Sequence, residues 1–411
     1  MKIGFISPKW LPHHGGQQQY AHRLALAMQG LGVETPIFCS TPEVEDKDNG
    51  ACEATRWSSP QLGSYDNWEP AFANAQINEG GVFWLYEFME AAVRWAISQN
   101  LDAVLISPPL TNPKFYPLRE LTKQLKAHGI KVGTILHDLD NRTRATLVQE
   151  YRKSKDWDSA AQAVKKAISI IMQKTSALRA YQFIGSPLFF DPDLVITSST
   201  WTSHFLDPLG VTPKFAMHPI LDVDYWSAPP PAADSLPPKN VLMINPIPHK
   251  GRLHMANLVR MADRDWTFRV LKGGYGDAFV GFVPMIADTV AVNQGHVTMD
   301  EYVQDMRTAY RAADVVFFPS LYEGYGMTAV EPMFAGTYVV SSNYPAVIEA
   351  VGDGAATVCP HTGTPAQWRA AVSDVLQRKS FWRAAIEKRV DELARRQDRE
   401  ITQLIDLIRN L

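Results

Sequence analysis

Short apolar runs alternate along the chain with segments whose apolar residues recur at helical spacing. Residues 2–7 form an apolar run as long as a buried strand, and residues 20–32 place apolar side chains three and four positions apart before Gly32. Residues 33–40 form the next apolar run. A strand, a helix and a second strand in this order predict a parallel sheet that is covered by helices.

The same alternation predicts further elements on both sides of a proline-rich segment. Residues 227–238, SAPPPAADSLPP, are predicted to be a linker because proline fixes its own backbone and lacks an amide donor. Residues 41–80 are irregular and rich in Trp, Asn, Gly and Pro. The other predicted elements are strands at 101–109, 130–140, 192–199, 240–246, 266–274, 314–320 and 337–342, and helices at 82–98, 115–129, 159–183, 200–210, 252–262, 299–313, 327–336, 365–377 and 381–411.

Size and composition support two doubly wound α/β halves. A chain of 411 residues is too long for one ordinary core, and a content of 46% hydrophobic and 20% charged residues is typical of a globular protein. The formal net charge is only -3, so no basic field favours nucleic-acid binding, and no zinc-finger or RNA-binding signature is present.

Cysteine use and the N-terminal sequence bear on the compartment. Cys39, Cys52 and Cys359 are odd in number and far apart, so neither a disulfide framework nor a metal site is expected. The start MKIGFIS lacks the pattern of a signal peptide, and no apolar stretch is long enough to span a bilayer. We therefore expect reduced thiols and a cytoplasmic location.

The stretch EGYGMTAVE places two carboxylates directly after the predicted strand 314–320. Gly324 and Gly326 allow the backbone to approach a ligand closely, and a helix is predicted to begin directly after them. Glu331 then lies about one turn into this helix, so Glu323 and Glu331 are able to contact different parts of one ligand. A carboxylate accepts hydrogen bonds from both hydroxyls of a vicinal diol.

Residues 314–345 resemble the donor-site segment of GT-B retaining glycosyltransferases, in particular the family-four group. The shared features are the E-x7-E motif and the small-residue turn AGT that follows it. Residues 15–32 are similar to the glycine-rich loop and first helix of that family, and the resemblance extends to TILHDLD at 134–140. It implies a GT-B fold of two Rossmann-like doubly wound domains that face each other across a cleft.

The resemblance also implies a division of labour between the domains. Residues 1–226 are expected to be an N-terminal Rossmann-like acceptor-binding domain, and residues 227–238 a proline-rich hinge. Residues 239–380 are expected to be the nucleotide-sugar-binding domain. The last helix, residues 381–411, is expected to cross back to the N-terminal domain.

Matched residue by residue, the family pattern implies donor-binding roles around the paired acids. Glu331 is expected to hold the ribose diol, and Glu323 to lie near the transferred sugar and its phosphates as a catalytic residue. The backbone amides of Gly324, Tyr325 and Gly326 are expected to contact sugar hydroxyls.

Further donor contacts are implied elsewhere in the chain. Gly15 and Gly16 are expected to bring backbone amides close to the donor phosphates. His137 is expected to contact the sugar near its reacting carbon as a catalytic residue. Lys250, together with the helix N-terminus at Met327, is expected to stabilise the leaving diphosphate.

One position departs from the family pattern. The family usually has an Arg and a Lys five residues apart at the diphosphate, and here Lys250 matches while Asn245 stands at the Arg position. Lys272 and Arg252 are the candidates to supply the missing positive charge.

These features predict a retaining glycosyltransferase that uses a nucleotide-sugar donor. The expected acceptor is a glycan or lipid-linked glycan of a bacterial surface polysaccharide. Alternatives are a sugar-nucleotide epimerase or a phosphorylase on the same scaffold, and a non-catalytic nucleotide-sugar-binding subunit of a glycan assembly complex. Neither a cofactor nor a metal is expected.

Several other clusters of polar or aromatic residues have a structural interpretation as well as a functional one. Asp138–Asp140 has the DxD spacing of some metal sites, and His13–His14 lacks a third ligand at a helpful spacing. The aromatic residues between Trp57 and Trp84 are able either to stack on acceptor sugars or to pack a loop-rich subdomain. Basic residues among apolar ones in 159–183 suggest a solvated helix face or a peripheral membrane surface. They are Lys165, Lys166, Lys174 and Arg179.

Overall fold

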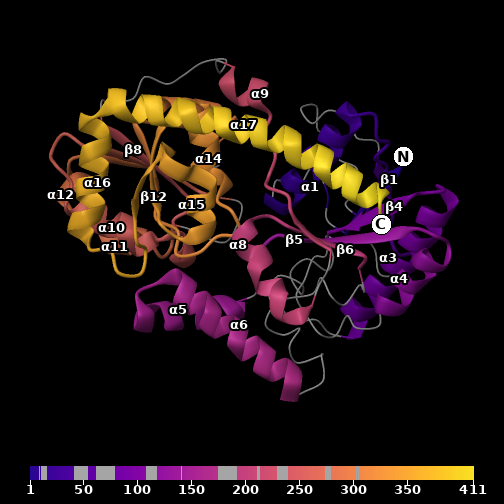
Figure 1. Ribbon diagram of the computed structural model, residues 1–411. Coiled ribbons are helices and arrows are strands. Elements are labelled where there is room, and N and C mark those ends of the chain that lie inside the picture. Colours follow the sequence, from indigo (N-terminus) through magenta and orange to yellow (C-terminus); the bar gives the residue numbers. More distant parts are fainter. Residues whose placement is uncertain are drawn as a thin grey trace. The chain divides into compact units, whose positions relative to one another are not determined.

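The computed structural model describes residues 1–8, 10, 16–40, 54–61, 79–107, 118–139, 141–174, 192–210, 213–228, 239–273, 279–301, 303 and 305–411. The chain divides into two compact units (Figure 1). Unit 1 comprises Met1–Ile220 and Gln397–Leu411, and unit 2 comprises Leu221–Arg396. Each unit is built on a parallel sheet with helices, as predicted.

In the described residues, unit 1 contains a seven-stranded sheet in the order β3-β2-β1-β4-β5-β6-β7. All neighbouring strands are parallel, so each connection needs a crossover, most of them helical. The strands are β1 (Ile3–Ser7), β2 (Ile37–Cys39), β3 (Ala54–Arg56), β4 (Ala103–Ile106), β5 (Lys131–Leu136), β6 (Leu194–Thr197) and β7 (Lys214–Ala216). The helices are α1 (Gly16–Gly30), α3 (Glu79–Ser98), α4 (Leu118–Ala127), α5 (Asn141–Ser154), α6 (Trp157–Lys174), α8 (Thr200–Ser203) and the 3-10 helix η4 (His204–Leu209).

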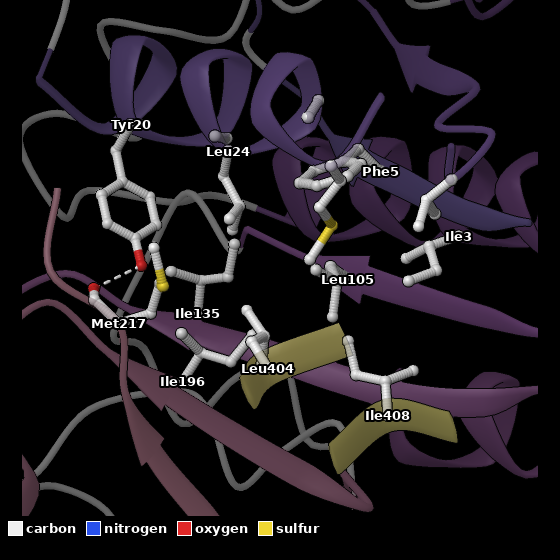
Figure 2. Packing of buried hydrophobic residues seen from close by; sticks show 14 of the residues in the cluster. Ile3, Phe5, Tyr20, Leu24, Leu105, Ile135, Ile196, Met217, Leu404 and Ile408 are labelled. Carbon is white, nitrogen blue, oxygen red and sulfur yellow. Dashed lines mark hydrogen bonds between the residues drawn. The ribbon is translucent and has the colours of Figure 1, made fainter. Parts of the chain in front are cut away.

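One face of the unit 1 sheet packs against α1 and the end of the C-terminal helix. Ile3 and Phe5 of β1 and Leu24 of α1 are buried in one hydrophobic cluster on this face. Leu404 and Ile408 from the end of the chain are buried in the same cluster (Figure 2). The C-terminal residues are therefore part of the hydrophobic core of unit 1.

The opposite face of this sheet packs against α3 and α4. Trp84, Phe88 and Trp95 of α3 are buried against the sheet. Gly4 of β1 makes this close packing possible, because a Cβ at this position would lie 2.4 Å from Leu101 Cδ1. The sheet is thus covered on both faces, as its continuous apolar strands predict.

In its described part, unit 2 contains a six-stranded parallel sheet in the order β10-β9-β8-β11-β12-β13. The strands are β8 (Asn240–Ile244), β9 (Thr267–Leu271), β10 (Val297–Asp300), β11 (Val315–Phe318), β12 (Tyr338–Ser342) and β13 (Ala356–Val358). The helices are α9 (Val223–Ser227), η5 (Pro248–Lys250), α10 (Arg252–Arg260), α11 (Val283–Ile286), α12 (Val290–Asn293), α13 (Met306–Ala312), α14 (Met327–Phe334), α15 (Pro345–Val351), η6 (Gly352–Gly354), α16 (Pro365–Gln377) and the part of α17 (Lys379–Arg409) up to Arg396, after which α17 belongs to unit 1.

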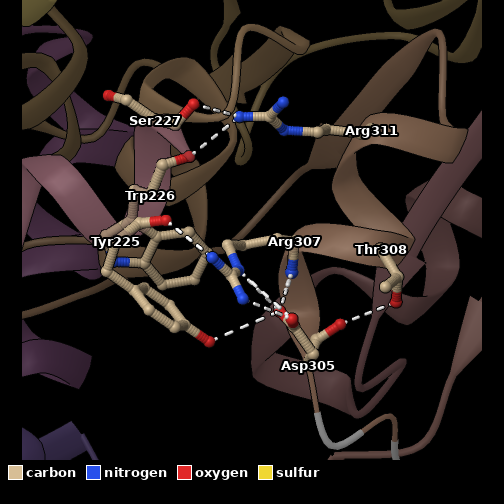
Figure 3. A network of polar contacts seen from close by, with 7 residues as sticks. All are labelled: Tyr225, Trp226, Ser227, Asp305, Arg307, Thr308 and Arg311. Carbon is tan, nitrogen blue, oxygen red and sulfur yellow. Dashed lines mark hydrogen bonds and ion pairs between the residues drawn. The ribbon is translucent and has the colours of Figure 1, made fainter. Parts of the chain in front are cut away.

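The border between the units lies at Leu221, earlier in the chain than the predicted border after Trp226. Polar contacts to α13 explain why α9 belongs to unit 2 (Figure 3). Arg311 donates to the carbonyl oxygens of Trp226 at 3.2 Å and Ser227 at 2.7 Å, and Arg307 donates to that of Tyr225 at 3.0 Å. Most of the predicted hinge, residues 229–238, lies outside the described residues.

The helix predicted at 299–313 is wrong in its first part. Met299 and Asp300 belong to strand β10, which pairs with β9. The helix α13 begins at Met306, where the Asp305 side chain accepts from the amide of Arg307 and caps it. Arg307 also donates to this carboxylate, and these hydrogen bonds lower the pKa of Asp305.

Candidate functional site

A loop of unit 2 is held against the end of β11 by Gly251. This residue has a φ of 87°, and a Cβ on it would lie 2.2 Å from the carbonyl oxygen of Pro319. Only glycine fits such a conformation at such a distance. A hydrogen bond also joins this loop to the residues after β11, because the amide of Leu321 donates to the carbonyl oxygen of His249 at 2.8 Å.

This approach brings Lys250 to Glu323. Lys250 Nζ lies 2.5 Å from Glu323 Oε1, and the two side chains are 26% and 13% exposed. Lys250 Nζ also lies 5.9 Å from the centre of the Phe318 ring. The structure therefore joins two of the predicted catalytic residues, separated in the sequence, in one partly buried ion pair.

The two glycines after Glu323 turn the chain into α14. Gly324 and Gly326 are buried, and Gly326 has a φ of 110°, which a residue with a side chain adopts at a cost. Gly326 is the N-cap of α14 and has no side chain that could accept from the first amides of the helix. Met327 is the first helical residue. The first amides of a helix attract negative charge, so this turn is suited to an anion.

Glu331 lies in α14 and is oriented by a tyrosine of α13. The hydroxyl of Tyr310 donates to Glu331 Oε2 at 2.8 Å, and Tyr310 is 1% exposed. Thr337 Oγ1 donates to the backbone oxygen of Tyr310 at 2.8 Å. A carboxylate accepts several hydrogen bonds, so Glu331 keeps capacity for further hydroxyl donors.

Asn245 follows β8 in a left-handed conformation with a φ of 55°. It is 6% exposed, and its side chain lies so close to Gly273 that a Cβ there would be 2.5 Å from Asn245 Cβ. Among the described residues its Oδ1 has no hydrogen-bond partner. A buried acceptor that no described residue satisfies fits contact with a bound molecule.

The two candidates for the missing cation lie beside other residues. Lys272 Nζ lies 3.3 Å from Glu301 Oε2. The guanidinium of Arg252 packs against Gly281, because a Cβ added to Gly281 would lie 1.7 Å from Arg252 Nη1. Of the predicted cations in unit 2, Lys250 is the one that the structure places beside Glu323.

His137 lies in unit 1, directly after β5. Its Nε2 is 3.1 Å from Ser107 Oγ, and its backbone oxygen accepts from Ser198 Oγ at 2.6 Å. The Tyr20 ring meets the imidazole edge-on at 5.1 Å between centroids. Burial lowers the pKa of His137 to about 3, so the imidazole is neutral near pH 7.

The glycine-rich segment of unit 1 is described only in part. Gly15 lies outside the described residues, and Gly16 is the first residue of α1. A Cβ on Gly16 would meet no described residue within 4 Å, so the described neighbours leave room for a side chain here. Tyr20 donates its hydroxyl to the carbonyl oxygen of Met217 at 2.7 Å, which joins α1 to the chain after β7 (Figure 2).

The other polar clusters of the sequence have structural roles where they are described. Asp138 forms an ion pair with Arg144 and accepts from the amide of Leu139. No group of three His, Cys, Asp or Glu residues in the described ranges is arranged to hold a metal ion. His13, His14 and Asp140 lie outside these ranges.

The basic and aromatic residues are partly explained by packing. Lys165 lies 3.1 Å from Asp207, and Lys166 is exposed. Trp57 and Trp84 pack together at 5.9 Å between ring centroids in the core of unit 1. Arg179 and the aromatic residues of 62–78 lie outside the described residues, as does the side chain of Lys174. No helix in the described part of the chain is long and apolar enough to cross a membrane.

Two residues that support the site have no signal in the sequence. Tyr310 holds Glu331, and Arg396 of α17 donates to the hydroxyl of Tyr325. Each is far along the chain from the residue that it contacts, and neither belongs to the motif.

Comparison with known proteins gives a family match in unit 2. Residues 291–395, which contain both acids of the motif, match the family described as glycosyl transferases group 1. A D-inositol 3-phosphate glycosyltransferase from Mycobacteroides abscessus is 33% identical over 138 residues, 32% of this chain and 31% of the relative. The matched segments span between 15% and 31% of the curated relatives' own lengths.

Solved structures resemble the whole chain. Sucrose-phosphate synthase from Thermosynechococcus elongatus has a TM-score of 0.67 at 16% identity, covering 100% of this chain and 98% of that one. HepE from Anabaena, in complex with UDP and glucose, has a TM-score of 0.64 at 14% identity, covering 100% of both chains. The predicted α/β fold of the GT-B type is confirmed.

Proposed function

We propose that this chain, which shares the glycosyl transferases group 1 segment and the GT-B fold, is a retaining glycosyltransferase that uses a nucleotide sugar. The observation that carries the proposal is the Lys250–Glu323 ion pair beside the buried turn Gly324–Gly326 at the start of α14. A fixed cation and the first backbone amides of a helix at one place suit a diphosphate leaving group.

Glu331 is proposed to bind the ribose of the donor. Its Oε2 is held by Tyr310, which fixes the direction of the carboxylate before the ligand arrives. Two ribose hydroxyls are donors that a carboxylate accepts well. Tyr310 thereby reduces the rotational freedom that binding would otherwise have to remove.

In the proposed reaction the bond between the anomeric carbon and the diphosphate breaks, and the diphosphate leaves with the electron pair. Lys250 and the amides at Met327 stabilise the charge that develops on it. The sugar becomes oxocarbenium-like, as in glycoside hydrolysis. The acceptor hydroxyl then bonds to this carbon from the same face, so the anomeric configuration is retained. Its proton passes to the departing phosphate oxygen.

His137 is proposed to contact the transferred sugar as a neutral group. Its lowered pKa excludes a positively charged imidazole near pH 7. A neutral imidazole donates from one ring nitrogen and accepts at the other, so it is able to bind a sugar hydroxyl. Gly15 and Gly16 are proposed to offer backbone amides to the donor phosphates, and Asn245 and Lys272 remain proposed donor contacts.

The proposal includes no metal and no cofactor, because Lys250 and the helix amides supply the positive charge. The proposed acceptor is a glycan or lipid-linked glycan of a bacterial surface polymer, reached from the cytoplasm at the inner face of the membrane. This acceptor class follows from the family resemblance.

A product assay tests the proposal. The protein is incubated with UDP-sugars and GDP-sugars, bacterial glycolipid extract and EDTA, and the products are identified by mass spectrometry. Release of nucleoside diphosphate together with a new glycoside, which keeps the anomeric configuration of the donor, is expected. An epimerised donor, a dependence on inorganic phosphate, or donor binding without turnover would instead identify an epimerase, a phosphorylase or a non-catalytic subunit.

A further inference from the structure

Two arginines of α17 contact the end of α15 and the turn before α14. Arg389 and Arg396 are seven residues apart, so they lie on one face of the helix two turns from each other. Arg389 donates to the carbonyl oxygens of Glu349 at 2.6 Å and Ala350 at 3.1 Å. The last carbonyl groups of a helix lie beyond its ladder of backbone hydrogen bonds, so Arg389 has a structural role at the end of α15.

Arg396 makes a different contact. It donates to the hydroxyl of Tyr325, and its guanidinium lies 5.7 Å from the centre of the tyrosine ring. Its distance to the carbonyl oxygen of Glu349 is 3.5 Å, at the limit of a hydrogen bond. Arg396 thus contacts a side chain of the proposed donor site.

Tyr325 is the single residue with a side chain between Gly324 and Gly326. It is 4% exposed, and burial raises the pKa of its hydroxyl, while the guanidinium groups of Arg396 and Arg389 oppose this shift. Glycines have no side chain to fix their own backbone, so the position of this turn depends on how the tyrosine ring is held.

We propose that Arg396 is a positioning residue of the donor site, which holds the Tyr325 hydroxyl and thereby fixes the backbone amides of Gly324–Gly326. The proposal rests on the proposed function, in which these amides bind the hydroxyls of the transferred sugar. Arg396 then acts on sugar binding through Tyr325 and does not touch the donor.

Tyr325→Phe and Arg396→Met test this contact. Tyr325→Phe removes one hydroxyl and keeps the buried ring, so it is expected to fold. Arg395→Met is the matched control, because Arg395 neighbours Arg396, is 71% exposed and lies 3.9 Å from Asp391. Arg389→Met tests the purely structural role at the end of α15.

The first measurement is amide hydrogen exchange of the peptide that contains residues 324–327, without ligand. We expect Tyr325→Phe and Arg396→Met each to speed exchange at least about tenfold, because each removes a hydrogen bond to a charged group that stabilises the closed turn. The double variant is expected to add nothing, because either change alone breaks the contact. Exchange that is unchanged in both single variants overturns the proposal.

The second measurement is calorimetric titration with UDP-glucose and UDP. The affinity for UDP-glucose is expected to fall about tenfold in both variants while that for UDP changes less than about threefold. Arg396→Lys is expected to restore part of this affinity, and Arg395→Met and Arg389→Met to leave it unchanged. An equal loss for both ligands overturns the positioning role.

The two measurements distinguish failure of the proposed function from failure of the positioning role of Arg396. If the unaltered protein binds neither ligand, the proposed function fails for this donor. The exchange measurement still decides whether Arg396 fixes the turn, because it needs no ligand.

Discussion

Replacing Gly251 by alanine tests how Lys250 is placed beside Glu323. A Cβ at Gly251 would lie 2.2 Å from the carbonyl oxygen of Pro319 and 2.7 Å from its Cγ. The first of these atoms is backbone, so it is unable to move aside by a side-chain rotation. The alanine therefore has to push the loop that carries Lys250 away from the end of β11.

The expected cost has two parts. A left-handed conformation costs a residue with a side chain about 1–2 kcal/mol, and forcing extra volume into a packed site costs about 1–3 kcal/mol more. Gly295→Ala is the matched control in unit 2, because Gly295 has a φ of 72° and a Cβ there would lie more than 4 Å from every described residue except its chain neighbours. Gly295→Ala is expected to lose only the free energy of unfolding that the left-handed conformation costs.

Urea unfolding gives the free energies, and turnover of the nucleotide sugar identified in the product assay gives the effect on the site. Gly251→Ala is expected to lower kcat/KM by about 10–100-fold, because a misplacement of about 1 Å at a reacting centre has an effect of this size. Gly295→Ala is expected to keep normal kcat/KM. If the two variants have equal unfolding free energies and equal activity, the close approach at Pro319 does not position Lys250.

Three other predictions concern charge, orientation and pH. Lys250→Met is expected to lower kcat about 10²–10³-fold with the fold intact, because a fixed charge at the leaving group is lost. Lys388 is exposed, and Lys388→Met is expected to keep full turnover. A fully active Lys250→Met variant refutes the role of Lys250. Tyr310→Phe is expected to weaken UDP binding about three- to tenfold in calorimetry by releasing Glu331, and unchanged affinity would show that the tyrosine does not orient it. Burial lowers the pKa of His22 to about 4, so the unfolded chain binds a proton that the folded chain does not, and stability falls by about 1.4 kcal/mol per pH unit as the pH drops from about 6.5 to 4. His22→Phe is expected to remove this part of the acid sensitivity in urea unfolding, and an unaltered pH dependence would contradict it.

Much of the fold could be predicted because buried parallel strands are continuous apolar runs. Residues 2–7 and 314–320 are such runs, and both contain central strands. Strand β10 could not be found in this way, because it lies at the sheet edge and is half exposed, so its sequence has no apolar run.

Helix α5 was missed although it carries a weak signal. Thr143, Leu147 and Tyr151 are buried and recur every four residues, but one of the three is polar and the surrounding residues are charged. The position of the unit border was also beyond sequence reasoning, since it depends on hydrogen bonds from Arg311 to the carbonyl groups at the end of α9.

The candidate site was predictable where its residues belong to one motif. Glu323 and Glu331 are separated by a turn whose glycines are visible in the sequence. Tyr310 and Arg396 were not predictable, because they reach the motif from other helices and only the packing of unit 2 brings them there. Long-range contacts of this kind leave no local pattern.

Binding of a nucleotide through Glu331 is tested most directly by calorimetric titration of UDP and GDP into the unaltered protein and into Glu331→Ala. We predict that one of these nucleotides binds and that the variant binds it at least about tenfold more weakly, because the acceptor for two ribose hydroxyls is gone. Equal affinity of the two proteins for the nucleotide, or no binding of either nucleotide to the unaltered protein, would contradict this prediction.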